Sequence, residues 1–127
     1  MTSPFLDRPE PEWIASNELA FAIHDGYPVS PGHALVVPRR VIATWFEASQ
    51  EERQAIFDLV DEVKRLLDAR TPAPDGYNIG INCGEAAGQT VMHLHVHVIP
   101  RYRGDVPDPT GGVRHVIPGK GNYLTGK

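Results

Sequence analysis

The stretch "VMHLHVHVIPR" (residues 91–101) alternates three histidines, His93, His95 and His97, with apolar residues. Residues two apart in a β-strand share a face and lie about 6.6 to 6.8 Å apart, so the alternation predicts three imidazoles on one face. The other face would pack beneath a helix and carries Met92, Leu94, Val96 and Val98. Imidazole suits neither a core nor a plain solvent face, so the histidine face predicts a functional site.

An amphipathic helix is the clearest element upstream of this stretch. Ser49 is a suitable N-cap, and Glu52, three residues on, completes a capping box. Apolar residues follow at helical spacing to about Arg70: Ile56, Leu59, Val60, Val63, Leu66 and Leu67. At 1.5 Å per residue the helix would be about 30 Å long, enough to cover one face of a small sheet.

Three further stretches read as strands. "NELAFAIHD" (residues 17–25) and "GHALVVPRR" (residues 32–40) predict a hairpin around the loop "DGYPVSPG", and "YNIGIN" (residues 77–82) predicts a third strand. Short turns between antiparallel neighbours, with one long helix, predict an α+β domain in which the helix covers one face of a mainly antiparallel sheet. The uncovered edge or face predicts a homodimer.

Composition narrows the classes of protein. A chain of 127 residues, 41% apolar and 22% charged, is of ordinary globular type and one domain long. The net charge of -4, with scattered Lys and Arg, argues against a long nucleic acid as partner. No apolar run is long enough to span a membrane and no signal peptide is evident, which predicts a cytoplasmic protein. Cys83 is the only cysteine, so neither an internal disulfide nor a zinc site of several thiolates is possible.

The histidine face allows three interpretations. The rings are ordinary surface or hydrogen-bonded histidines, or they bind a metal with His33 completing the set, or one of them is a nucleophile. Neutral imidazole keeps a lone pair on one nitrogen, so it can attack phosphorus and later leave. The residues by themselves leave metal binding and nucleophilic catalysis both open.

Two segments resemble the histidine triad (HIT) superfamily. "AGQTVMHLHVHVIPR" contains its signature, His-φ-His-φ-His-φ-φ with φ apolar, at residues 93–99, and "AFAIHDGYPVSPGHALVVP" is similar to its first hairpin. "GQTV" before the triad and "PR" after it are typical of the fragile-histidine-triad branch and its bacterial dinucleoside polyphosphate hydrolases. The resemblance implies a five-stranded sheet, one long and one short helix, and a single domain over residues 1–127, with a core at 17–104 and an irregular tail at 105–127.

The resemblance also implies site residues. His95 would be the nucleophile, and a protonated His97 would contact phosphate oxygens or the leaving group. His93, with His33 behind it, would orient His95, and the His93 carbonyl would accept the proton of one ring nitrogen. Asp25 would bind the ribose hydroxyls, although a turn aspartate before glycine is an equal interpretation without the resemblance. The remaining substrate-binding residues, donors to the phosphates and the leaving oxygen, would be Asn82, Gln89 and Thr90.

The implied activity is hydrolysis or transfer at the α-phosphate of a nucleotide, through a covalent nucleotidyl-histidine, with release of a nucleoside monophosphate. Dinucleoside polyphosphates such as diadenosine tetraphosphate are the expected substrates. We expect no cofactor or metal bound by the protein, with Mg²⁺ arriving, if at all, on the substrate. Two alternatives remain: a nucleotide-binding protein with weak phosphoramidate hydrolysis that acts through partner contacts, and a zinc-dependent hydrolase that uses the histidine cluster.

Overall fold

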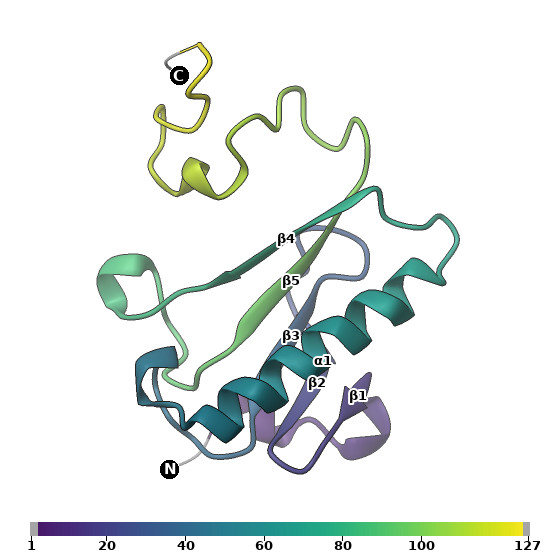
Figure 1. Cartoon of the computed structure of the whole chain (residues 1–127), viewed down its shortest axis with the longest axis vertical. Helices are drawn as coiled ribbons and strands as arrows, with labels where there is room; N and C mark the ends of the chain where they lie inside the picture. The colour runs from purple at the N-terminus through teal and green to yellow at the C-terminus, as the bar shows by residue number, and fades with distance from the viewer. Residues whose placement is uncertain (1–2, 126–127) are drawn as a thin grey trace.

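A single antiparallel sheet organises the chain, which the computed structural model describes over residues 3–125 (Figure 1). Its strand order is β1-β2-β3-β5-β4. The strands are β1 Ala15–Ser16, β2 Ala20–His24, β3 Ala34–Pro38, β4 Gly76–Ile81 and β5 Val96–Arg101. The last strand of the chain therefore lies between β3 and β4, and the predicted α+β class with five strands is confirmed.

The predicted hairpin is β2 and β3, which pair with Ile23 opposite Leu35. Its loop depends on Gly32, whose φ of 90° lies in the region that favours glycine. A Cβ at this position would come within 2.8 Å of the Leu67 side chain and 2.7 Å of Arg70, so the loop and the helix end meet here without room for a side chain.

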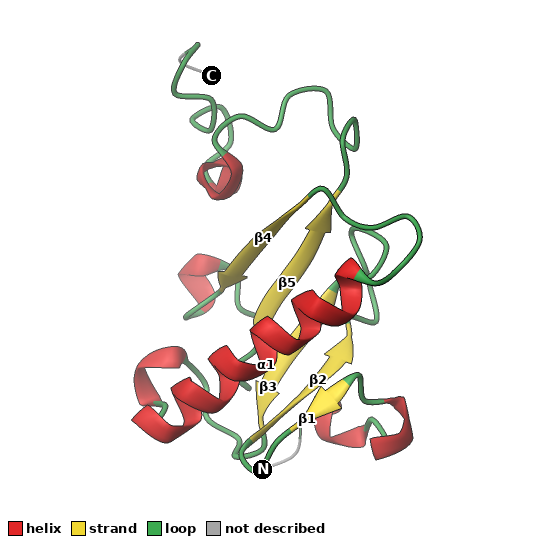
Figure 2. Ribbon diagram, turned by 45° about the vertical axis from the view of Figure 1, so that its right-hand side comes forward, coloured by secondary structure: helices red, strands yellow, loops and turns green. Residues whose placement is uncertain are grey.

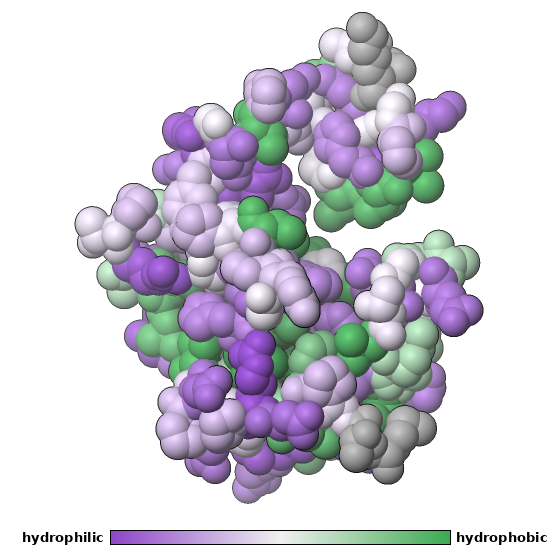
Figure 3. Space-filling view, turned by 180° about the vertical axis from the view of Figure 1, so that it is seen from behind, coloured by the Kyte–Doolittle hydropathy of each residue, from purple (hydrophilic) through white to green (hydrophobic). Residues whose placement is uncertain are grey.

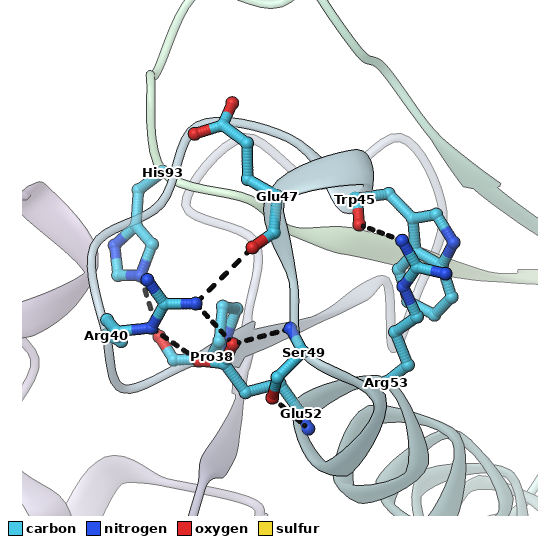
Figure 4. Close-up of polar contacts among 8 residues, drawn as sticks. All are labelled: Pro38, Arg40, Trp45, Glu47, Ser49, Glu52, Arg53 and His93. Carbon is cyan, nitrogen blue, oxygen red and sulfur yellow. Dashed lines mark hydrogen bonds and ion pairs between the residues drawn. The ribbon is translucent and has the colours of Figure 1, made fainter.

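The predicted helix is α1, Gln50–Asp68, which crosses one face of the sheet (Figure 2). Its capping box forms as expected: Glu52 N–H donates to Ser49 Oγ at 3.0 Å, and Ser49 N–H donates to Glu52 Oε1 at 2.9 Å. Arg40 donates to the same carboxylate from the end of β3, at 2.7 Å (Figure 4). The helix start is thus tied to the sheet.

Short 3-10 turns supply the remaining helical structure. They are η1 Pro4–Asp7, η2 Glu10–Glu12, η3 Trp45–Glu47, η4 Glu85–Ala87 and η5 Gly112–Val116. The first two form the irregular, proline-containing start that the sequence predicts, and η5 lies in the tail. Over residues 3–125, no helix has the length and apolar character that a membrane crossing requires.

Apolar clusters lie on both faces of the sheet. On the helix face, Leu94, Val96 and Val98 are buried against α1, as the alternation predicts, whereas Met92 is 40% exposed and does not join them. The opposite face has a second cluster, formed by Phe21, Ile23, Leu35 and Val37. Phe5 and Trp13 cover this cluster, so the N-terminal segment (residues 3–13) takes the place that a second helix layer would occupy.

The strand predicted over residues 91–101 begins only at Val96, so His93 and His95 precede β5. Leu94 N–H donates to the carbonyl of Ile42 at 2.7 Å, which ties residues 91–95 to the loop after β3 instead of to β4. Pairing with β4 begins at Val96 opposite Ile81. In this irregular segment Leu94 is buried on the helix face and His95 lines the cavity on the other face, but Met92 is exposed, so the alternation holds only from Leu94 onward.

The tail after residue 104 stands apart from the sheet and turns back near η5 (Figures 1 and 2). Hollows of about 450 and 560 Å³ separate it from the ends of β4 and β5. The view from the side opposite α1 shows this hollow, with apolar tail side chains bordering it (Figure 3). The predicted irregular tail is confirmed.

Candidate active site

A cavity of about 430 Å³ lies on the sheet face opposite α1. Seven of the eight predicted site residues line it: Asp25, His33, Asn82, Gln89, Thr90, His95 and His97. The eighth, His93, is behind the cavity wall and only 1% exposed. Residues distant in the sequence therefore meet where the β2–β3 loop, the loop after β4 and the start of β5 come together.

His95 is held in one tautomer by the main chain. Its Nδ1 lies 2.7 Å from the carbonyl oxygen of His93. A carbonyl only accepts, so Nδ1 carries the proton and the neutral ring keeps its lone pair on Nε2. This contact agrees with the prediction for the His93 carbonyl, and it gives the ring the form that a nucleophile needs.

His97 is held in the tautomer that complements His95. Val29 N–H donates to His33 Nδ1 at 3.2 Å, so His33 carries its proton on Nε2. That nitrogen is 2.9 Å from His97 Nδ1, which therefore accepts, and His97 carries its own proton on Nε2. One backbone N–H thus fixes the tautomers of both His33 and His97. In the cavity, His95 has a lone pair on Nε2 and the neighbouring His97 has a proton on Nε2.

His33 therefore acts on His97, and the prediction that it stands behind His93 is wrong. The His93 ring is instead enclosed by other partners. Nδ1 is 2.7 Å from Ser3 Oγ. Nε2 is 2.7 Å from the carbonyl of Pro38, the contact that Figure 4 shows. The sequence signal for His33 was correct in placing it at the site. The alternation of residues 93–97 does not specify which histidine it meets, because His93 lies outside the regular strand.

Burial keeps these rings neutral. Burial, with smaller contributions from His95 and His33, lowers the pKa of His97 to about 4, and Asp25 only partly opposes this. Burial also lowers the pKa of His33 and of His93. In the free protein at pH 7, His97 is therefore a neutral hydrogen-bond donor; its protonated form in contact with a phosphate stays a prediction.

Asp25 is a turn aspartate and also borders the cavity, so both interpretations of its sequence position apply. Its Oδ1 accepts from Tyr27 N–H at 2.8 Å, as a turn aspartate does. Its Oδ2 lies 3.4 Å from His33 Nε2 and 3.9 Å from His97 Nδ1, at the cavity wall. The turn therefore fixes the carboxylate, and the second oxygen borders the space where a ligand would lie.

The three predicted donors differ in their availability. The Gln89 side chain is 3% exposed and donates to the carbonyls of Ala43 and Val91, at 2.6 and 3.1 Å, while Gly84 N–H donates to its Oε1. Both of its amide hydrogens are thus used to hold the loop, and its predicted role as a phosphate donor is wrong for this conformation. Asn82 and Thr90 line the cavity with more exposed side chains.

Sequence reasoning missed the contribution of the N-terminal segment. The Phe5 ring packs edge-on against His95, with centroids 4.9 Å apart, and Arg8 and Tyr27 line the same cavity. A signal was present: Phe5 and Trp13 are large apolar residues in a segment without strand or helix periodicity, so they need a surface to cover. The hydrophobic face of the β2–β3 hairpin opposite the helix is that surface.

The donor set fits a zinc ion poorly. Oxygen and nitrogen atoms of Asp25, His33 and His97 lie within 4.8 Å of one another. However, Val29 N–H occupies His33 Nδ1, so the proton sits on Nε2, the atom that would have to bind the metal. If the proton moved to Nδ1 instead, the Nδ1–H and the Val29 N–H would be two donors facing each other. The hydrogen bonds therefore favour a metal-free cluster.

A cavity with an imidazole lone pair beside an imidazole N–H holds the two groups that nucleophilic attack on a phosphate requires, a lone pair to attack and a donor for the charge that develops. The HIT domain model matches residues 10–104 of the chain, which therefore belongs to the HIT family.

Relatives with known names agree with this membership. AP-4-A phosphorylase of Mycobacterium tuberculosis is 34% identical over 103 residues, 80% of this chain and 52% of that protein. Bis(5'-nucleosyl)-tetraphosphatase [asymmetrical] of Schizosaccharomyces pombe is 35% identical over 103 residues, 78% of this chain and 56% of that protein. The chain spans about half to three fifths of the length of the curated relatives that it matches first.

Among solved structures, a HIT family protein from Bacillus anthracis superposes with a TM-score of 0.69 at 35% identity. The match covers 74% of this chain and 66% of that one. The five-stranded sheet with one long helix thus matches the fold of a solved HIT family protein.

Proposed function

We propose that the chain is a nucleotidyl hydrolase or transferase that acts at the α-phosphate of a nucleotide derivative, with dinucleoside polyphosphates such as diadenosine tetraphosphate as its substrates. The observation that carries the proposal is the hydrogen bond from His95 Nδ1 to the His93 carbonyl, because it leaves the His95 lone pair on Nε2. The names of the M. tuberculosis and S. pombe relatives support the choice of substrate class.

The reaction follows from the tautomers. The His95 Nε2 lone pair forms a bond to the α-phosphorus, and the bond from phosphorus to the leaving polyphosphate oxygen breaks. The adduct ring is then cationic, and the His93 carbonyl stabilises it by accepting a hydrogen bond from its Nδ1–H. His97 Nε2–H donates to the oxygen that gains charge, and the hydrogen bond from His33 keeps that proton on Nε2.

The second step regenerates the imidazole. A water attacks phosphorus and releases one proton to solvent, the P–N bond breaks with its electron pair returning to His95 Nε2, and a nucleoside monophosphate leaves. Inorganic phosphate in place of water would give a nucleoside diphosphate. In this proposal Asp25 Oδ2 accepts from ribose hydroxyls, and Asn82 and Thr90 donate to phosphate oxygens, since all three line the cavity. We propose that any Mg²⁺ arrives with the polyphosphate, since Asp25 is the one carboxylate among the described lining residues.

The test is a single turnover with diadenosine tetraphosphate labelled in the adenylate. Wild-type protein, quenched in alkali, should carry label on His95, and chromatography should resolve a labelled monophosphate, or a diphosphate when phosphate is present. His95→Ala should lower kcat by about 10⁴-fold or more, roughly 5 kcal/mol of barrier. Binding without turnover in wild type would favour the nucleotide-binding alternative, and most of the activity surviving in His95→Ala would refute the covalent mechanism.

We also propose that the functional form is a homodimer. Strand β4 is an edge of the sheet with Ile79 49% exposed, and the tail presents Val113, Val116 and Ile117, each more than half exposed. A second copy of the chain would cover these apolar side chains and the unpaired edge. Sedimentation at micromolar concentration should give about twice the monomer mass of 14.0 kDa. A monomer there would contradict the proposal.

A further inference from the structure

Ser3 reaches the site from the other end of the chain. Its Oγ is 2.7 Å from His93 Nδ1, although the two residues are 90 positions apart. Ser3 is 3% exposed and His93 is 1% exposed, so water does not compete for this contact. None of the nucleotide chemistry proposed above uses Ser3.

The direction of the hydrogen bond is fixed. His93 Nε2 lies 2.7 Å from the Pro38 carbonyl, which only accepts, so the His93 proton is on Nε2 and Nδ1 is an acceptor. The Ser3 hydroxyl must therefore donate to Nδ1. The same oxygen accepts from Phe5 N–H at 3.2 Å and so caps η1. The single hydroxyl proton is thus committed to His93.

The His93 ring joins three parts of the chain. It binds Ser3 of the N-terminal segment and Pro38 at the end of β3, while its own backbone belongs to the loop before β5. The carbonyl of that backbone holds His95 Nδ1, and the Phe5 ring next to Ser3 packs against the His95 ring. A shift of the His93 ring would therefore move both the acceptor and the aromatic wall of His95.

We propose that Ser3 is a positioning residue for the nucleophile: its hydroxyl holds the His93 ring in one tautomer and place, and through the His93 carbonyl it keeps the Nε2 lone pair of His95 in line. The kinetic part of this inference rests on the proposed function. Its structural part, the direction of the Ser3 hydrogen bond, does not.

The structural part is tested by long-range ¹H–¹⁵N correlation spectra of the histidine rings in the full-length protein without ligand. In wild type, His93 should show a protonated Nε2 and an unprotonated, hydrogen-bonded Nδ1. In Ser3→Ala the His93 and His95 signals should broaden or shift as the ring loses its donor. A wild-type spectrum with a proton on His93 Nδ1 would overturn the inference whatever Ser3→Ala does.

The kinetic part compares three variants. Ser3→Ala should lower kcat about tenfold, equivalent to about 1.4 kcal/mol of barrier. Ser3→Thr, which keeps the hydroxyl, should restore kcat to within about threefold of wild type, or about 0.65 kcal/mol. Trp13→Phe is the matched control: it removes the hydrogen bond from Trp13 Nε1 to the Arg8 carbonyl, another anchor of the N-terminal segment, but leaves His93 and the stacking on Phe21 in place.

Trp13→Phe should keep the wild-type kcat and the wild-type histidine spectrum. An equal loss of kcat in Trp13→Phe and Ser3→Ala would reduce Ser3 to an anchor of the segment and refute a positioning role, as would a wild-type kcat in Ser3→Ala. If wild type forms no labelled adduct, the proposed function fails, whereas the histidine spectra still decide the Ser3 contact.

Discussion

Acidification from pH 7 to pH 5 should destabilise the protein through His97. The folded state lowers the pKa of this ring from 6.5 to about 4. Between these values the unfolded chain binds a proton that the native protein does not, so the free energy of unfolding falls as the pH falls. Above pH 6.5 the His97 ring is neutral in both states and costs no stability. The free energy of unfolding then falls steadily as the pH drops from 6.5 toward 4.

The size of the effect follows from the same two pKa values. With 6.5 unfolded and about 4 folded, the linkage relation gives a loss of about 2 kcal/mol between pH 7 and pH 5. The side chain is 21% exposed, so solvent screening reduces this little. Burial of His33 and His93 acts in the same direction, so 2 kcal/mol is the part assigned to His97 alone.

The assay is urea unfolding at pH 7.0 and 5.0 in buffers of equal ionic strength, for wild type, His97→Asn and His115→Asn. The wild-type and His115→Asn proteins, the latter altered in the exposed tail, should lose the same amount between the two pH values. His97→Asn should lose about 2 kcal/mol less. A pH dependence unchanged in His97→Asn would refute the interpretation of His97 as a buried neutral ring.

Three further substitutions test other parts of the structure. His33→Phe should lower kcat by roughly tenfold or more in steady-state assays with diadenosine tetraphosphate, because His97 Nδ1 loses its donor and the proton is no longer held on Nε2; wild-type kcat would contradict this. Glu52→Ala should lower the free energy of unfolding by about 2 kcal/mol in urea titrations, since it removes the capping box and the Arg40 contact, whereas exposed Glu51→Ala should cost much less. Gly32→Ala should cost about 2 kcal/mol in thermal unfolding, from its φ of 90° and the contact with Leu67; a melting curve like that of wild type would show that the loop relaxes freely.

The elements that the sequence predicted best are those whose determinants are local. Ser49 and Glu52, three positions apart, specify the start of α1 through their capping box, and the spacing of the apolar residues specifies the buried face of the helix. The hairpin is likewise local, since the two stretches that predict its strands, residues 17–25 and 32–40, are joined by one short loop. Neither prediction depended on which distant segments would meet.

The errors concern contacts between distant segments. The alternation of residues 91–101 predicts a continuous strand, but the ladder with β4 begins at Val96, because Leu94 binds the loop after β3. The resemblance implied His33 behind His93, whereas the pairing of β3 with β5 puts Leu35 opposite His97 and brings His33 to that ring. Period-two patterns give the face of a residue and not its neighbour.

The N-terminal segment could not be placed from periodicity, although its large apolar residues Phe5 and Trp13 indicate that it covers a surface. Its 3-10 turns have no periodicity to detect, and its hold on the site depends on hydrogen bonds between groups about 90 residues apart, such as that of Ser3 with His93. Gln89 shows the opposite limit: its residue type fits phosphate binding, but the loop uses its whole amide. Residue type alone did not distinguish these two uses.

The strand order has a consequence for synthesis on the ribosome. β5 is translated last yet fills the slot between β3 and β4, so β4 has no partner in the sheet until β5 has left the exit tunnel. The nascent chain can complete the hairpin and α1, but His95 and β5, which follows it, join the sheet together at a late stage. A ribosome stalled before residue 101 would therefore hold the hairpin and α1 without the strand that joins β3 to β4.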